Sequence, residues 1–334
     1  MPETEFKLAR AGDVALVTID NGEDYTKPTF FGRTALASLD GVLDELERGD
    51  FAALVLTGKP FVFAAGADLN EFHGASAELA RDGSRAGHDL FGRLAALPFP
   101  TVAAINGACL GGGLEIALHC DARTISSAVR HVASPEVFLG IVPAWGGTQL
   151  VPRLAGVEAA VKLIVLNPLR QNRLLDAAGA VELGLADRLL GPAEFVDESI
   201  SFALDLTSEM ARGRTVLEAD PAGVLRRASA QIDDTVHGAA PAPYRALDLI
   251  GGAASGWTLE EGYRAEEEAV AELLPGRHAQ ASLYAFDLVE RRAKRRPPFV
   301  ANAPVRRVEK VGIVGAGLMA RQIATVVLRL SRTP

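Results

Sequence analysis

The first third of the chain alternates between apolar segments and segments with helical spacing. Residues 13–20 are apolar and rich in β-branched side chains, and residues 51–58 and 101–107 are short apolar runs, which predicts three strands. Residues 34–49 and 77–97 place leucine and other apolar side chains at helical spacing, which predicts helices on either side of the second strand. Strands that alternate with helices favour an α/β fold with a largely parallel sheet.

The pattern changes after about residue 190, where helical periodicity takes over. We therefore predict a core over 1–190, a helical linker region over 191–305, and a third segment over 306–334. Strand character returns only in EKVGIVGAG (309–317). The basic, proline-containing run at 291–298 is typical of a solvated linker, with a surface for an acidic partner as the alternative.

Composition limits the classes of protein to which the chain can belong. Of 334 residues, 49% are hydrophobic and 23% are charged, as in soluble globular proteins, and the net charge of −8 predicts no nucleic-acid partner. Cys109 and Cys120 lie in apolar sequence, which predicts buried thiols in a reducing compartment. The N-terminus lacks a secretory pattern and no apolar run reaches roughly 18 residues, so we expect a cytoplasmic protein without a membrane span.

Glycines interrupt the junction between a strand and a helix in NGACLGGGLEIALHCD (106–121). Glycine lets a ligand approach the main chain, here at a helix N-terminus with unpaired N–H groups. The candidate occupants are a phosphate, although neither G-x-x-x-x-G-K-[ST] nor G-x-G-x-x-G is present, and a developing oxyanion. Close packing of helix against strand is the structural alternative. FVFAAGADLNEF (61–72) repeats the arrangement, which favours two N–H groups directed at one carbonyl oxygen.

Two glutamates stand alone among apolar residues near these turns, Glu115 after the glycines and Glu136 in VASPEVFLGIVPAWGGTQ (132–149). A carboxyl group in such surroundings resists ionisation and can act as a general acid or base near neutral pH. Either glutamate alone would more often be structural. Together, beside two glycine turns, they indicate a catalytic site.

Other chemistry receives little support from the sequence. The six histidines show no i, i+4 pair and no Cys-x-x-Cys partner, so we expect no metal site. No G-x-S-x-G nucleophile elbow is present. Asp68 and Asp121 are interpreted first as helix caps or structural carboxylates.

The segments FAAGADLNEF, NGACLGGGLEIALHCD and PEVFLGIVPAWGGTQLVPRLAG resemble the crotonase (enoyl-CoA hydratase/isomerase) superfamily, and the resemblance covers roughly residues 5 to 190. It implies the ClpP-like crotonase fold, an α/β spiral of ββα turns that form two near-perpendicular sheets ringed by helices. Here the spiral would carry a helical C-terminal extension and the start of a Rossmann unit. Family analogy also implies a homo-oligomer.

The resemblance assigns roles to residues of the motifs. It implies that the N–H groups of Ala67 and Gly112 form an oxyanion hole for a thioester carbonyl, and that Glu115 and Glu136 are the two catalytic carboxylates. The implied reaction is addition of water to trans-2-enoyl-CoA in fatty-acid β-oxidation, with no cofactor beyond the coenzyme A that the substrate carries.

Further residues are expected to contact the substrate. They are Gly66, Asp68, Leu69, Gly111, Ala144 and Trp145. Ala144 replaces a glycine that is common in the family and Trp145 is unusual there, so the acyl pocket should have its own shape. Lys59 and Arg33 are candidates for contacts with the CoA phosphates, with solvated surface as the alternative.

A second glycine motif, KVGIVGAGLMA (310–320), fits the G-x-G-x-x-A dinucleotide fingerprint with Gly315, Gly317 and Ala320. The restart resembles fatty-acid oxidation multifunctional enzyme α subunits, in which an NAD-dependent 3-hydroxyacyl-CoA dehydrogenase follows the hydratase. Only one βα unit is present, so we expect a fragment of a longer protein that does not use NAD itself. The resemblance also suggests a thiolase β subunit as a partner.

Two alternatives to hydration stay open. A Δ3-Δ2-enoyl-CoA isomerase needs only one of the two carboxylates. A non-catalytic acyl-CoA-binding scaffold of a β-oxidation complex would bind the thioester without turning it over.

Overall fold

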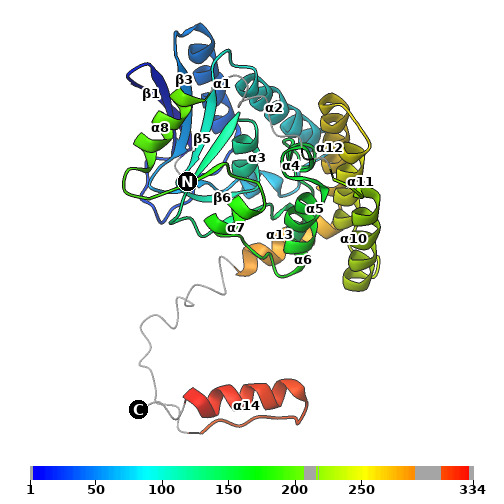
Figure 1. Ribbon diagram of the computed structural model, residues 1–334. Helices are drawn as coiled ribbons and strands as arrows, with labels where there is room; N and C mark the ends of the chain where they lie inside the picture. Colours follow the sequence, from blue (N-terminus) through cyan, green and yellow to red (C-terminus); the bar gives the residue numbers. More distant parts are fainter. Residues whose placement is uncertain (1–2, 207–215, 217, 290–309, 331–334) are drawn as a thin grey trace. The chain divides into compact units, whose positions relative to one another are not determined.

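The computed structural model describes residues 3–206, 216, 218–289 and 310–330. Residues 1–286 form one compact unit and residues 287–334 a second (Figure 1). Helices on both sides of residue 190 belong to the first unit. The predicted division of the chain at residues 190 and 305 stays a prediction.

Two sheets organise the first unit. In the described residues the larger sheet has the order β1-β2-β3-β5-β7-β9, antiparallel between β1 and β2 and parallel elsewhere. The smaller sheet has the parallel order β4-β6-β8. The strands of the larger sheet are β1 (Glu5–Ala11), β2 (Val14–Asp20), β3 (Ala53–Gly58), β5 (Thr101–Ile105), β7 (Ala122–Ser126) and β9 (Arg188–Leu190). Those of the smaller sheet are β4 (Phe61–Ala64), β6 (Gly107–Leu110) and β8 (Val132–Ala133).

The chain builds these sheets by repeating one ββα turn. Each turn adds one strand to the larger sheet, then one to the smaller sheet, and then a helix. The three helices are α2 (Ala77–Ala95), α3 (Gly112–Leu118) and α4 (Gly147–Ala155). Short 3-10 helices, η1 (Leu69–Phe72) and η2 (Glu136–Leu139), follow β4 and β8. The predicted α/β spiral with a largely parallel sheet is confirmed.

Helices cover both faces of the larger sheet. On one face lies α8 (Phe195–Asp205) (Figure 1). Its Phe195 and Phe202 belong to one buried cluster with Val55 and Val102 of the sheet. The other face packs against α1 (Arg33–Arg48) and the main core, because α1 buries an apolar stripe that includes Leu39. Strands buried on both faces explain the nearly continuous apolar runs in the sequence.

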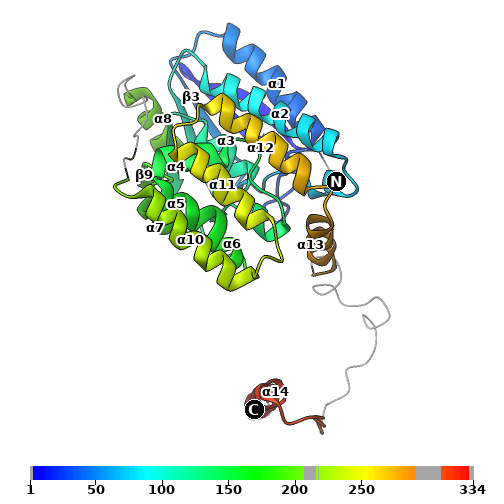
Figure 2. The same ribbon diagram turned by 90° about the vertical axis from the view of Figure 1, so that its right-hand side faces the viewer.

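The segment beyond the spiral is helical within the described residues, as the sequence predicts. Its α12 (Leu259–Leu273) lies along α2 and its α11 (Ala242–Ala254) lies along α4 (Figure 2). Arg81 of α2 forms a two-bond ion pair with Glu268 of α12. The remaining helices of this unit are α5 (Val157–Ala160), η3 (Val161–Leu166), α6 (Asn167–Leu169), α7 (Ala177–Glu182), α10 (Pro221–Val236), α11 (Ala242–Ala254), α12 (Leu259–Leu273) and α13 (Arg277–Leu288).

In the second unit, the prediction of a strand at 309–317 is wrong for the residues that are described. The described part of this unit contains the helix α14 (Leu318–Leu330), but residues 310–317 form no strand, and residue 309 lies outside the description. An apolar segment becomes a strand only when a neighbouring strand accepts its backbone hydrogen bonds, and the described part of this unit contains none. The proposed linker at 291–298 lies outside the described residues.

The predicted burial of both thiols is confirmed, because Cys109 and Cys120 are buried and form no disulfide. Burial raises the pKa of the Cys120 thiol to about 12 and raises that of Cys109 further, so both are protonated, inert thiols. No helix among the described residues is long and apolar enough to cross a bilayer.

Candidate active site

The three motif segments meet at one edge of the smaller sheet. The loop with Gly66 follows β4, Gly111 follows β6, and Glu136 follows β8. Because β4, β6 and β8 are parallel neighbours, their carboxyl ends lie at the same edge. The hydrogen bond from Gly111 N to Ala133 O, 2.9 Å long, joins two of these ends directly. Topology therefore brings together residues that are up to 70 positions apart in the sequence.

Two glycines are required at this edge. Gly66 and Gly111 have φ of +88° and +52°, in the region that favours glycine. A Cβ on Gly66 would lie 2.9 Å from the carbonyl oxygen of Leu110 and 3.1 Å from Gly112 N. A Cβ on Gly111 would lie 2.6 Å from Oε1 of Glu136. The glycines therefore allow two loops and a carboxylate to approach closely, which a side chain would prevent.

The backbone N–H groups of Ala67 and Gly112 are close together, and neither is paired within the described residues. Gly66 O accepts from Phe31 N and Asp68 N donates to Phe31 O, so the segment is held while Ala67 N stays free. Gly112 is the first residue of α3, where a helix leaves its N–H groups without intrahelical partners. Neither N–H has an acceptor within the described part of the chain. A Cβ built on Gly112 would lie 3.6 Å from Ala67 N.

Glu115 is a buried carboxylate held by backbone donors. Its side chain leaves α3, the residue is 5% exposed, and Oε1 accepts hydrogen bonds from Trp145 N at 2.8 Å and Gly147 N at 2.9 Å. Burial raises its pKa well above the ordinary value, and the negative charges of Glu136 and Glu266 raise it further. The two N–H donors act in the opposite direction.

Glu136 is the second buried carboxylate. It opens η2 and is 8% exposed, and its Oε2 accepts a hydrogen bond from Ser134 Oγ at 2.7 Å. Burial raises its pKa to about 7. Because the charge of one carboxylate opposes ionisation of the other, Glu115 and Glu136 titrate as a pair that retains a proton near neutral pH.

The raised pKa of Glu136 predicts a pH dependence of stability. The folded chain holds this proton up to about pH 7 whereas the unfolded chain releases it near 4.5, so folding stability falls as pH rises through this window. The full slope is about 1.4 kcal/mol per pH unit. Glu136→Gln cannot ionise, so its free energy of unfolding should gain on that of wild type between about pH 5 and pH 8. Urea unfolding across this range measures the difference, and parallel pH profiles would contradict the prediction.

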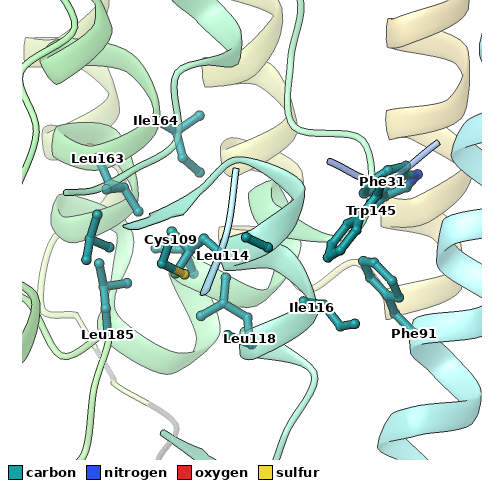
Figure 3. Close-up of a cluster of buried hydrophobic side chains, with 14 of the residues drawn as sticks. Phe31, Phe91, Cys109, Leu114, Ile116, Leu118, Trp145, Leu163, Ile164 and Leu185 are labelled. Atoms are coloured by element: carbon teal, nitrogen blue, oxygen red, sulfur yellow. The ribbon is translucent and has the colours of Figure 1, made fainter. Parts of the chain in front are cut away.

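Trp145 lies against Gly112. A Cβ on Gly112 would lie 2.3 Å from Cζ3 of the indole. The ring packs near Phe91 and Phe31, with centroids 5.5 and 6.3 Å away, and Figure 3 shows the three rings together at one side of the buried cluster. Its Nε1 donates to Gly83 O at 3.0 Å. Trp145 is thus a rigid wall beside the candidate site.

The other residues predicted to contact substrate have mixed surroundings. Asp68 caps η1 by accepting from Asn70 N, in agreement with its interpretation as a helix cap, and it also lines a cleft of about 490 Å³. Leu69 and Ala144 are half-buried and pack against the core. Arg33 lines the same cleft, which lies along residues 21–35 and 68–71.

Lys59, a candidate for contacts with the CoA phosphates, is instead a buried structural residue. It is 4% exposed, and Nζ donates to Asn21 Oδ1 and to the carbonyl oxygens of Glu23 and Asp24. With its three N–H donors engaged, this ammonium fixes the loop that borders the cleft. It is neither a free phosphate ligand nor solvated surface.

The described residues contain no group of three or more His, Cys, Asp and Glu side chains that could hold a metal ion. Asp121 accepts hydrogen bonds from Thr101 N and Oγ1, in agreement with a structural role. The dinucleotide motif has Gly315 at a φ of +107° directly before α14. Within the described residues of that unit, no strand precedes this helix.

Sequence reasoning missed one carboxylate beside the site, Glu266 of α12, which is 0% exposed. It lies in AEEEAV, a run that looks like the solvated face of a helix. Helical spacing nevertheless places it on one face with Tyr263 and Val270. That apolar face was the available signal.

A family model described as enoyl-CoA hydratase/isomerase matches residues 11–234. The chain belongs to the enoyl-CoA hydratase/isomerase family. This confirms the crotonase resemblance, and both glycine turns and both glutamates fall inside the matched residues.

Known proteins extend this result. A relative named fatty acid oxidation complex subunit alpha from Shewanella amazonensis is 34% identical over 99% of this chain, and the chain spans 48% of that relative. Among solved structures, an enoyl-CoA hydratase from Bacillus anthracis is 25% identical over 85% of this chain and 96% of its own, with a TM-score of 0.54. Human mitochondrial delta3-delta2-enoyl-CoA isomerase is 22% identical over 87% of this chain and 99% of its own, with a TM-score of 0.61. The family fold thus accommodates both activities.

Proposed function

We propose that the chain is an enoyl-CoA hydratase, which adds water to trans-2-enoyl-CoA to give 3-hydroxyacyl-CoA. The observation that carries this proposal is the pair of buried carboxylates, Glu115 and Glu136, beside two unpaired backbone N–H groups. An isomerase moves one proton along a substrate and needs one carboxylate. Addition of water requires one group to activate water and another to protonate carbon, so two favour hydration.

In the proposed mechanism the two carboxylates hold one water between them. Glu115, whose Oε1 is fixed by Trp145 N and Gly147 N, takes a proton from the water as its oxygen bonds to the β-carbon. The π electrons move toward the thioester oxygen, and Glu136 gives its proton to the α-carbon on the same face. Transfer of the proton from Glu115 back to Glu136 restores the starting state.

The enolate charge that develops on the thioester oxygen requires donors that are already in place. The N–H groups of Ala67 and Gly112 have no other acceptor in the described residues, so they are available to that oxygen. The indole ring of Trp145 packs against one side of Gly112. Arg33 and Asp68 line a cleft, and Asp68 directly follows Ala67 in the sequence. This cleft is the proposed path of the CoA moiety.

Hydration by this route needs no cofactor beyond the CoA of the substrate, and NAD enters no step. The name of the Shewanella relative supports the further proposal that the chain is part of a fatty-acid oxidation α subunit. A cytoplasmic location, a homo-oligomeric state, a thiolase partner and an NAD-dependent dehydrogenase activity of a longer protein are proposals that depend on this relationship.

The test follows the absorbance of the conjugated enoyl thioester of crotonyl-CoA. Loss of absorbance with wild type, unchanged by added NAD and without NADH formation, is the expected result. A matched assay supplies a 3-enoyl-CoA and follows the appearance of the same absorbance. Glu115→Gln should abolish hydration. If wild type fails to hydrate crotonyl-CoA and Glu115→Gln still isomerises the 3-enoyl-CoA, the isomerase is favoured. Tight binding of crotonyl-CoA without turnover would favour the scaffold.

A further inference from the structure

Both carboxylate oxygens of Glu266 are engaged in polar contacts, although its helix is far in sequence from the catalytic motifs. Its Oε2 accepts from Gly146 N at 2.7 Å and lies 2.9 Å from Nε2 of His88. Its Oε1 accepts from Thr148 N at 2.9 Å and from Thr148 Oγ1. A buried carboxylate is costly unless its oxygens are satisfied, and here both are. The family match ends at residue 234, so Glu266 lies outside it.

The turn that Glu266 contacts is the one that holds Glu115. Four successive N–H groups, from Trp145 to Thr148, are divided alternately between two carboxylates. Glu115 accepts the first and third, and Glu266 accepts the second and fourth. Because a turn clamped from both sides cannot tilt toward either carboxylate, α12 fixes the orientation of the two donors that hold Glu115.

Glu266 also acts on Glu115 through space. Its negative charge is one of the causes that raise the pKa of Glu115, after burial and the charge of Glu136. Other ionisable groups surround this cluster on each packed element. They are His88 of α2, Glu115 of α3 and His119 just after it, Glu136 of η2, Arg153 of α4, and Tyr263 and Glu267 of α12.

We propose that Glu266 is a positioning residue for the hydration reaction, which clamps the turn at residues 145–148 so that Glu115 and Trp145 are held in their working geometry. This inference rests on the proposed function for its kinetic consequences. The part of the proposal that concerns structure, that Glu266 fixes the position of Trp145, does not depend on any activity.

Glu266→Gln tests the proposal, since the amide keeps the size of the side chain but replaces one acceptor oxygen with a donor. We expect kcat to fall by about a hundredfold, the effect of a small misplacement of a catalytic group, with KM changed less. Loss of the charge lowers the pKa of Glu115, so the acid limb of the kcat profile should move to lower pH. The matched control is Glu268→Gln, which loosens the α2–α12 contact through Arg81 without touching the turn.

Thr148→Val separates the two effects of Glu266, which are its hold on the turn and the influence of its charge on the pKa of Glu115. It removes the hydroxyl donor to Glu266 but leaves the charge in place, so kcat should fall while the acid limb stays where it is in wild type. Thr148→Ser should restore activity. These variants keep the proposal testable if Glu266→Gln fails to fold.

Fluorescence reads the turn without reference to activity. The chain has two tryptophans, and in a Trp257→Phe background the emission reports Trp145 alone. Glu266→Gln should shift this emission to longer wavelength and increase its quenching by acrylamide, whereas Glu268→Gln should leave both unchanged. An inert wild type with this shift would overturn the proposed function and leave the clamp intact. Unchanged emission together with an unmoved acid limb would overturn the clamp.

Discussion

Replacing Glu136 with glutamine is expected to lower kcat for hydration of crotonyl-CoA by about 10²- to 10⁴-fold, the usual contribution of a general acid or base. Glutamine retains the size of the side chain and can still accept from Ser134 Oγ, but it has no proton to give to the α-carbon. Since the cleft proposed to bind CoA is unchanged, KM should change much less. Steady-state kinetics with crotonyl-CoA measure both parameters.

The free energy of unfolding distinguishes a catalytic loss in Glu136→Gln from a loss caused by unfolding. The free energy of unfolding of the same variant is expected to rise relative to that of wild type as pH increases through about 7, because the folded variant contains no buried carboxylate that must ionise. An inactive variant whose stability relative to wild type does not change with pH would indicate that Glu136 is structural. Activity close to that of wild type would remove Glu136 from the mechanism.

Replacing Gly66 with alanine is expected to lower kcat by about 10²- to 10³-fold, as loss of one oxyanion donor does. The added Cβ would lie 2.9 Å from Leu110 O and 3.1 Å from Gly112 N, which are backbone atoms that cannot move aside cheaply. The strand ends must separate, and the N–H groups of Ala67 and Gly112 then no longer reach one oxygen together. Crotonyl-CoA turnover by the purified, folded variant checks the result.

Gly74→Ala is the matched control for this substitution. Gly74 has a φ of +69°, close to the +88° of Gly66, but a Cβ there would meet no atom within 4 Å. Both variants therefore carry the strain of a side chain at positive φ, about 1 kcal/mol. Only Gly66→Ala should lose activity. An equal loss in both variants would mean that strain, and not the close approach of two amides, is responsible.

Much of the site could be predicted from local sequence. A glycine at positive φ, a lone glutamate in an apolar segment and a strand followed by a turn each leave a local signature, so the residue types and their order are enough to identify Gly66, Gly111, Glu115 and Glu136. Family resemblance then supplied the roles that local patterns leave open. The buried strands at 53–58 and 101–105 were equally predictable, because burial on both faces requires continuous apolar residues.

Long-range pairing could not be predicted in the same way. The apolar segment at 310–317 has the composition of a strand, yet forms none, because a strand depends on a partner that composition does not reveal. Lys59 has the sequence surroundings of a surface lysine, and only the fold of the loop at residues 21–24 over its ammonium buries it.

The sequence by itself indicated an α/β fold with a largely parallel sheet and the two isolated glutamates, because these depend on short segments whose residue types have local physical causes. The resemblance of its motifs to a known family implied the spiral. Only the tertiary structure decided which strand ends meet and that Glu266 reaches the turn at residues 145–148. A charged residue in a polar helical run carries no sign of its partner, and 118 residues separate Glu266 from Thr148. Packing of α12 against α2 brings it there, and that packing is a property of the whole fold.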